Sequence, residues 1–246
     1  MQFYNASIYI SILSITAPLF IYITRRKEFA VQSHVVGIFL CGSLLSDVIA
    51  FICLKLDMSP VLVNNLFDIF SFIILSFFFY HLFLHSRPKF IVITGSGVYG
   101  ISLVYFIYTL GIHLPHTALW AINNTLMTFY SLLYFILLPW MVLERLLDKH
   151  LHSYVIINGS FLFYCLLTLL IFLSADYFLR TADENTKGIF WSLHNVANTI
   201  KNIGLAIGLY YTGRRDVKTT LLEIEKIGRQ QSGEEYEQVW AKSFKK

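Results

Sequence analysis

Charged side chains are scarce in this 246-residue sequence. They make up 14% of the residues, whereas a soluble domain carries about 25%. This depletion excludes an ordinary water-soluble domain, and the long apolar runs indicate a single integral membrane bundle. The formal net charge of +4 does not indicate a nucleic-acid partner, because the basic residues lie between apolar runs and not in one patch.

Cysteine is also rare. Cys41, Cys53 and Cys165 all lie inside apolar segments and form no CxxC motif, which argues against a disulfide framework and a thiolate metal site. The motifs GxSxG, HExxH and Walker A are missing from any usable context, so an enzyme is disfavoured. No basic region precedes the first apolar run, and we therefore expect a first spanning helix in place of a cleavable signal peptide.

Apolar segments long enough to cross a hydrocarbon core of about 30 Å dominate the chain. They comprise residues 6–24, 32–54, 61–84, 90–110, 119–143, 153–174 and 188–211. The sequence thus predicts an all-α fold, a seven-transmembrane helix bundle over residues 1–213. Pro18 and Pro139 fall inside spans and are expected to kink them.

Lysine and arginine predict the orientation of the bundle. Fifteen of the 19 lie after the first, third, fifth and last spans, and three lie on the opposite side. The positive-inside rule then places the N-terminus outside and the C-terminus in the cytoplasm. We expect a multi-pass protein of a cell membrane, the inner membrane in a bacterium, with the lipid bilayer as its first partner.

The tail, residues 214–246, carries an amphipathic pattern. Val217, Leu221 and Ile224 share one helical face, which predicts a short interfacial helix on the inner leaflet. The alternative is a disordered tail after a stop-transfer end. Because the tail is too short for an effector domain, any output is expected to pass through a cytoplasmic signalling partner.

The last apolar segment, residues 188–211, carries a polar stripe. At about 100° per residue, one arc of roughly 120° contains Trp191, His194, Asn195, Asn198, Lys201 and Asn202. A lysine near the middle of a bilayer costs about 3 kcal/mol on insertion scales and is a functional-site hypothesis by default.

Other spans bring polar groups to the same outer half of the membrane. Asp47 lies in the second span, Asp68 shares an arc of the third with Asn64 and Asn65, and Asn124 lies in the fifth. We expect a hydrated, outward-facing pocket, because so many donors and acceptors need water or a ligand. Its predicted ligand-binding residues are Lys201, His194, Asn195, Asn198, Asn202, Trp191, Asp68, Asn64, Asn65, Asp47 and Asn124.

Two interpretations without a ligand-binding pocket also stay open. Lys201 with Asp68 or Asp47 can form a buried ion pair that holds the bundle together. His81 and His85 have the i,i+4 spacing of metal ligands, but no third ligand is placed nearby, so we expect interfacial histidines and no metal.

The seven spans and the lysine at the centre of the last helix resemble microbial rhodopsins. The resemblance implies retinal on Lys201 as a Schiff base, with Asp68 as counter-ion. Ala197 replaces the acid common four residues before that lysine, and the surroundings of Lys201 are rich in amides where a retinal pocket is aromatic. No cofactor is therefore predicted, with retinal on Lys201 kept as an alternative.

A second resemblance covers nearly the whole chain. The segments SLLSDV at 43–48, LFDIFSF at 66–72 and LHNVANTIKNI at 193–203 look like those of small bacterial heptahelical membrane proteins. This resemblance implies the same span count and supplies no reaction.

Three functions are compatible with these patterns. The first is a receptor-like or sensory protein that binds a small polar or anionic ligand through Lys201 and His194, alone or as a homo-oligomer. The second is a proton-coupled transporter using Asp68 and Lys201, although no internal repeat is evident. The third, an intramembrane enzyme with His194 as acid or base, ranks last because only one histidine lies at the right depth.

Overall fold

Helices account for all regular structure in the part of the chain that the computed structural model describes, residues 2–84, 87–114, 117–144, 151–181 and 184–212. They are α1 (Gln2–Ser14), α2 (Thr16–Arg25), η1 (Arg26–Glu28), α3 (Val31–Lys55), α4 (Val61–Leu82), α5 (Lys89–Leu110), α6 (Thr117–Glu144), α7 (Leu151–Thr181) and α8 (Glu184–Tyr211). The predicted all-α class is confirmed. The predicted interfacial helix, in the tail 214–246, lies outside the described residues.

Six helical stretches are long and apolar enough to cross a membrane. They are Ala6–Glu28, Val31–Lys55, Val61–Leu82, Lys89–Leu110, Thr117–Pro139 and Leu151–Ile171, within the described residues. By length and composition the chain is therefore a multi-pass integral membrane protein. The seventh predicted span falls in α8, which is not among the six because its polar stripe lowers its hydropathy. With 28 residues and about 1.5 Å per residue, α8 is nevertheless long enough to cross a bilayer.

The first span is interrupted at Ile15, between α1 and α2. Pro18 has no N–H group, so the carbonyl of Ser14 loses its helical partner. The helix resumes at once, because the N–H of Leu19 donates to the carbonyl of Ile15 at 3.2 Å. The predicted kink at Pro18 is confirmed, whereas α6 continues as one helix through Pro139.

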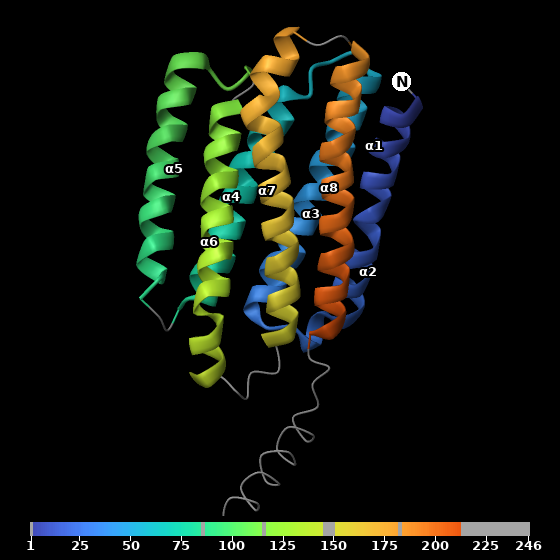
Figure 1. The fold of residues 1–246 in the computed structure, drawn as a ribbon. Helices are drawn as coiled ribbons and strands as arrows, with labels where there is room; N and C mark the ends of the chain where they lie inside the picture. The colour runs from blue at the N-terminus through green and yellow to red at the C-terminus, as the bar shows by residue number, and fades with distance from the viewer. Residues whose placement is uncertain (1, 85–86, 115–116, 145–150, 182–183, 213–246) are drawn as a thin grey trace, which may run out of the picture.

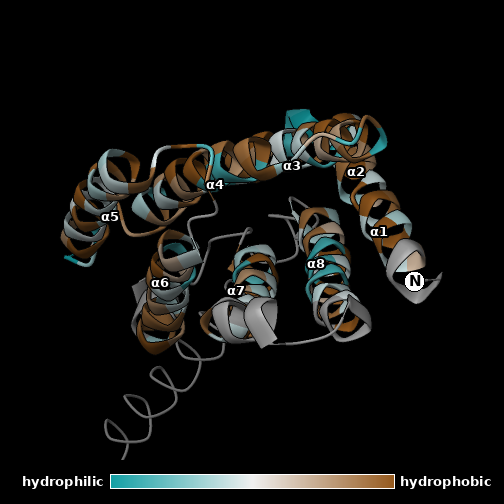
Figure 2. Cartoon of the chain, turned by 90° about the horizontal axis from the view of Figure 1, so that it is seen from above, coloured by the Kyte–Doolittle hydropathy of each residue, from teal (hydrophilic) through white to brown (hydrophobic). Residues whose placement is uncertain are grey.

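The helices form a closed ring around the bundle axis. Consecutive long helices alternate in direction (Figure 1). Viewed along the axis, α2 to α5 form one row and α6 to α8 a second, and α1 closes the gap between α2 and α8 (Figure 2). The first and last helices of the described chain are therefore neighbours and run in the same direction.

An aromatic core fills the half of the ring that contains the ends of α4 and α8. The ring of Phe161 packs edge-on against Phe39, with centroids 5.4 Å apart, and lies 6.0 Å from Phe78. All three are buried, as are Leu205 and Leu209 of α8. A large polar cavity lies toward the other end of the bundle.

Two glycines allow α7 and α8 to pack closely. A Cβ atom on Gly208 would lie 2.6 Å from Cγ1 and 3.2 Å from the backbone N of Ile157, and one on Gly204 would lie 2.9 Å from Cβ of Ser160. Small residues permit such contacts between membrane helices. The close contact sets the rotation of α8, so that Lys201 points toward the bundle axis.

Candidate functional site

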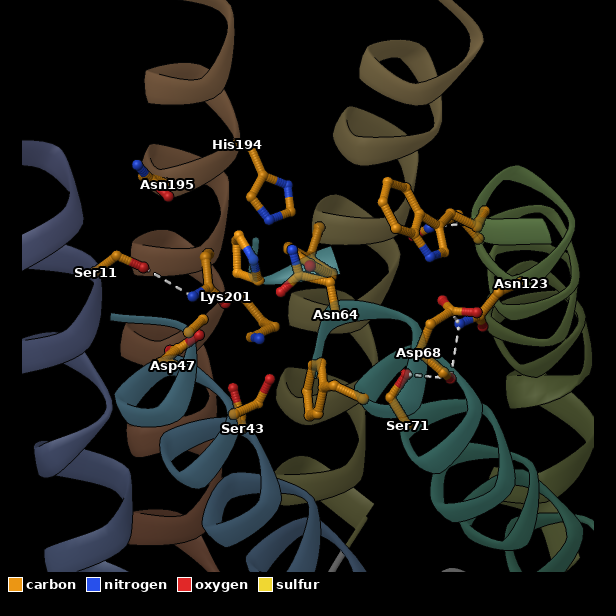
Figure 3. A pocket seen from close by; sticks show the side chains of 18 of the residues that line it. Ser11, Ser43, Asp47, Asn64, Asp68, Ser71, Asn123, His194, Asn195 and Lys201 are labelled. Atoms are coloured by element: carbon orange, nitrogen blue, oxygen red, sulfur yellow. Dashed lines mark hydrogen bonds between the residues drawn. The ribbon is translucent and has the colours of Figure 1, made fainter. Parts of the chain in front are cut away.

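A cavity of about 510 Å³ lies inside the ring, in the half where α3 ends and α4 begins. Side chains from α1, α3, α4, α6, α7 and α8 line it, and Figure 3 shows the polar ones pointing into it from opposite walls. Its volume falls in the range of roughly 300–1,000 Å³ that is usual for small-molecule sites.

Most of the predicted binding residues meet at this cavity. Its lining includes Asp47, Asn64, Asp68, Asn124, Trp191, His194, Asn195, Asn198 and Lys201. The other two do not line it. Asn65 donates to the carbonyls of Ile112 and Leu114, both at 2.8 Å, and so holds the chain that follows α5 against α4. Asn202 is buried against α1.

Lys201 lies at the inner end of the cavity, next to the aromatic core. Its side chain is 1% exposed, and its Nζ lies 4.5 Å from the ring centroid of Tyr164 and 4.9 Å from that of Phe39. Cation–π contacts of this kind attract the ammonium but satisfy none of its three N–H donors. Among the described residues no acceptor lies within hydrogen-bond distance of Nζ.

Asp47, on α3, is the acid that interacts electrostatically with Lys201. Its carboxylate accepts no hydrogen bond in the described part of the chain, and Oδ2 is buried. No ion pair within 4.0 Å joins it to Lys201 among the described residues. The buried ion pair that the sequence allows, Lys201 with Asp47 or Asp68, is thus not formed.

Asp68 lies on the opposite wall and is held by two other helices. The hydroxyl of Tyr99 on α5 donates to Oδ2 at 2.7 Å, and Nδ2 of Asn123 on α6 donates to Oδ1 at 2.6 Å. Tyr99 in turn stacks on Phe72, with centroids 3.7 Å apart. Asp68 therefore joins α4, α5 and α6 and is not paired with Lys201, contrary to what the rhodopsin resemblance implies.

The asparagines of α8 are bound to serines of α1. Asn195 donates to Ser7 at 3.0 Å, Asn198 to Ser11 at 2.8 Å and Asn202 to Ser14 at 2.8 Å. These contacts, which we call the serine–asparagine ladder, give the α8 amides protein partners. They reduce the surplus of polar groups that was expected to need water or a ligand, but Oδ1 of Asn202 is still buried without a hydrogen-bond partner among the described residues.

Asn124 on the fifth predicted span also has protein partners. Its Nδ2 donates to the carbonyl of Trp120, and its Oδ1 accepts from the hydroxyl of Thr168, both at 2.8 Å. Asn124 therefore joins α6 to α7 at the cavity wall, and its amide is largely committed to the fold.

The histidines of the described chain show no metal site. No group of three or more His, Cys, Asp or Glu side chains that could hold a metal ion is found there. The ring of His81 packs against Phe77, with centroids 4.3 Å apart, and His85 lies outside the described residues. His194 lines the cavity, 5.9 Å from the ring centroid of Tyr164.

Sequence reasoning missed several residues that shape the site. Ser7, Ser11 and Ser14 have the i, i+4, i+7 spacing of one helical face, which marks a polar stripe opposite that of α8. Asn123 lies beside Asn124 but points to another helix, and no sequence signal distinguishes Tyr99 from the other 14 tyrosines.

No family model, curated protein or solved structure matches this chain. The geometry itself therefore defines the class: a multi-pass helical membrane protein with a cavity inside the bundle that polar and aromatic side chains line.

Proposed function

We propose that the chain is a receptor-like or sensory seven-helix membrane protein that binds a small polar ligand carrying an anionic group. The observation that carries this proposal is the Lys201 ammonium, buried at the inner end of a cavity and without an acceptor among the described residues. A buried charge is costly unless it is paired. A carboxylate or phosphate oxygen of a ligand would supply the charge-assisted hydrogen bonds that Lys201 lacks.

The proposed topology has seven spans, with the N-terminus outside and the C-terminus in the cytoplasm. It is supported by the course of α8, which lies alongside α7 and α1 (Figure 1). Arg25, Arg26, Lys27, Arg87 and Lys89 lie at the end of the bundle opposite the cavity. By the positive-inside rule, that end faces the cytoplasm and the cavity faces outward.

One helix, α8, connects the cavity with the proposed cytoplasmic end of the bundle, and this connection supports a sensory role. Lys201 lies on α8, and the last carbonyls of α8 are bound by the guanidinium of Arg25, which donates to Tyr210 and, at 3.1 Å, to Thr212. A ligand that displaces α8 at Lys201 therefore acts on the helix end that precedes the tail 214–246. We propose that a cytoplasmic partner protein binds this tail.

The test is ligand-dependent stabilisation of the purified full-length protein. A panel of small carboxylates and phosphates is added, and thermal unfolding is followed in detergent, because a ligand that binds only the folded state raises Tm. We expect at least one compound to raise Tm in wild type and not in K201M, with K89M as the matched control at the other end of the bundle. Equal stabilisation of wild type and K201M, or a panel without any stabilising compound, contradicts the proposal.

A second candidate, a retinal-binding protein, is favoured by the aromatic surroundings of Lys201. Phe39 and Tyr164 flank Nζ, and Trp120 and Trp191 line the same cavity, while the amide N–H groups of the α8 asparagines donate to serines of α1. On this proposal Asp47 of the second span, and not Asp68, serves as the acid near Lys201. A visible absorption band after addition of all-trans retinal, lost in K201M, supports it; no band in wild type rules it out.

A further inference from the structure

Two groups of opposite charge in the cavity wall lack hydrogen-bond partners. They are the Lys201 ammonium on α8 and the Asp47 carboxylate on α3, neither of which has a partner in the described part of the chain. Both line the cavity and interact electrostatically, yet they are more than 4.0 Å apart. Figure 3 shows both side chains near Ser43, on the wall opposite Asp68.

We propose that this pair binds the two charged groups of a zwitterionic α-amino acid, the ligand carboxylate on Lys201 and the ligand ammonium on Asp47. The inference rests on the proposed function and names the ligand class of the same site. An amino acid carries both groups on one carbon atom, so it can bridge an acid and a base that are too far apart for a direct ion pair. Each bridge is a charge-assisted hydrogen bond.

Charge balance favours a zwitterion over a simple ion. A plain anion on Lys201 would bring a second negative charge toward Asp47, and a plain cation on Asp47 would be repelled by Lys201. Inside a bundle of low dielectric both repulsions are large. A ligand with one positive and one negative group leaves neither Lys201 nor Asp47 without an opposite charge.

Asp68 is the weaker competitor for the ligand ammonium. Both of its oxygens already accept hydrogen bonds, from Tyr99 and Asn123. Asp47, which accepts none among the described residues, is therefore the acid with more free acceptor capacity, and Ser43 and Ser46 beside it add hydroxyl groups to the same wall.

The rest of the lining selects the side chain of the ligand. Besides its polar groups the cavity presents aromatic and aliphatic side chains, among them Phe51, Phe67, Trp120, Met127 and Leu75. The volume of about 510 Å³ leaves room beyond the charged groups. We therefore expect apolar or aromatic amino acids to bind better than acidic or basic ones.

The experiment uses the purified full-length protein, isothermal titration calorimetry and three matched probes. L-Phenylalanine carries both charges, 3-phenylpropanoate lacks the ammonium, and 2-phenylethylamine lacks the carboxylate. We expect L-phenylalanine to bind at least about tenfold more tightly than either analogue, since each loses one hydrogen bond between charged groups. In D47N, 3-phenylpropanoate should bind about as well as L-phenylalanine. In K201M, 2-phenylethylamine should bind about as well as L-phenylalanine. D57N and K89M, changed at exposed or distant charges, should retain the wild-type order.

The outcomes separate this inference from the proposed function. If 3-phenylpropanoate binds as tightly as L-phenylalanine in wild type, and loses affinity in K201M, the zwitterion inference is wrong and an anion site on Lys201 stands. The same conclusion follows if none of the three probes binds but another anion does bind and loses affinity in K201M. Binding of L-phenylalanine that is unchanged in K201M overturns both. D47S and K201Q replace D47N and K201M if either variant does not yield monodisperse protein.

Discussion

The side-chain amide of Asn198 donates a hydrogen bond to the hydroxyl of Ser11 at 2.8 Å, which joins the last described helix to the first. Like pairs, Asn195 with Ser7 and Asn202 with Ser14, lie on either side of it. The partners are always 187 or 188 positions apart, because α1 and α8 are parallel. The serine–asparagine ladder closes the ring of helices beside the cavity.

The hydrogen bond between Ser14 and Asn202 is suited to a test of the ladder, because neither residue lines the cavity. S14A removes the acceptor of Asn202, and a double-mutant cycle with N202A should give a coupling energy of about 0.6 kcal/mol, the average for hydrogen bonds between membrane helices. Thermal or chemical unfolding in detergent measures it. S102A is the control, because the hydroxyl of Ser102 donates to Val98 of its own helix. A coupling energy of zero would show that this pair adds no stability.

The contact between α7 and α8 predicts opposite effects for two glycine substitutions. G208A places a Cβ atom 2.6 Å from Cγ1 of Ile157 and should lower the free energy of unfolding by about 1–3 kcal/mol through overpacking. G100A meets nothing within 4 Å and should be neutral or stabilising by up to about 1 kcal/mol, since alanine favours helix more than glycine. Thermal unfolding of both variants, side by side, checks this. Equal Tm values would contradict the close packing.

Tyr99 is expected to stabilise the junction of three helices at Asp68. Y99F leaves Oδ2 of a partly buried carboxylate without its donor, which should cost about 1–3 kcal/mol. The control is Y105F on the same helix, whose ring is 62% exposed. Unfolding midpoints measured in detergent compare the two variants, and a Y99F protein as stable as Y105F would show that this hydrogen bond does not stabilise the fold.

Topology is testable by cysteine labelling in a background without Cys41, Cys53 and Cys165. A membrane-impermeant maleimide added to intact cells should label S59C, in the loop at the cavity end, and should label K27C only after permeabilisation. Both positions are exposed. The reverse pattern would place the cavity on the cytoplasmic side.

A third labelling position tests whether α8 crosses the membrane. K246C should behave like K27C if the chain has seven spans, because its tail then lies on the side of the basic loops. Labelling of K246C in intact cells, with K27C protected, would leave six spans and would remove Lys201 from the middle of the bilayer.

The helices could be predicted from the sequence because lipid imposes a simple requirement. Backbone groups in hydrocarbon must bond within their own segment, so long apolar runs become helices. The predicted segments 32–54 and 61–84 match α3 and α4 to within two residues. The predicted segment 153–174 is shorter than α7, which reaches Thr181, since hydropathy marks the apolar stretch and not the helix end.

The pairing of side chains is harder to predict. Periodicity shows which residues share a face of one helix but not which helix that face meets. The sequence allows an ion pair between Asp68 and Lys201, whereas the carboxylate of Asp68 bonds to Tyr99 and Asn123. Ser7, Ser11 and Ser14 are common small residues in a membrane span, so only the position of α1 next to α8 reveals their role.

The repetition of the ladder has a consequence for motion. Its three pairs are chemically alike and follow each other at three- or four-residue intervals, so the register of α8 on α1 is degenerate. A slide of α8 by one turn, about 5.4 Å, would bring Asn195 to Ser11 and Asn198 to Ser14, and only one of the three hydrogen bonds would be lost. The ladder by itself therefore opposes such a slide only weakly, and the contacts of α8 with α7, where Ser153 donates to the carbonyl of Gly208 at 2.8 Å and Gly208 packs on Ile157, hold the register and with it the depth of Lys201.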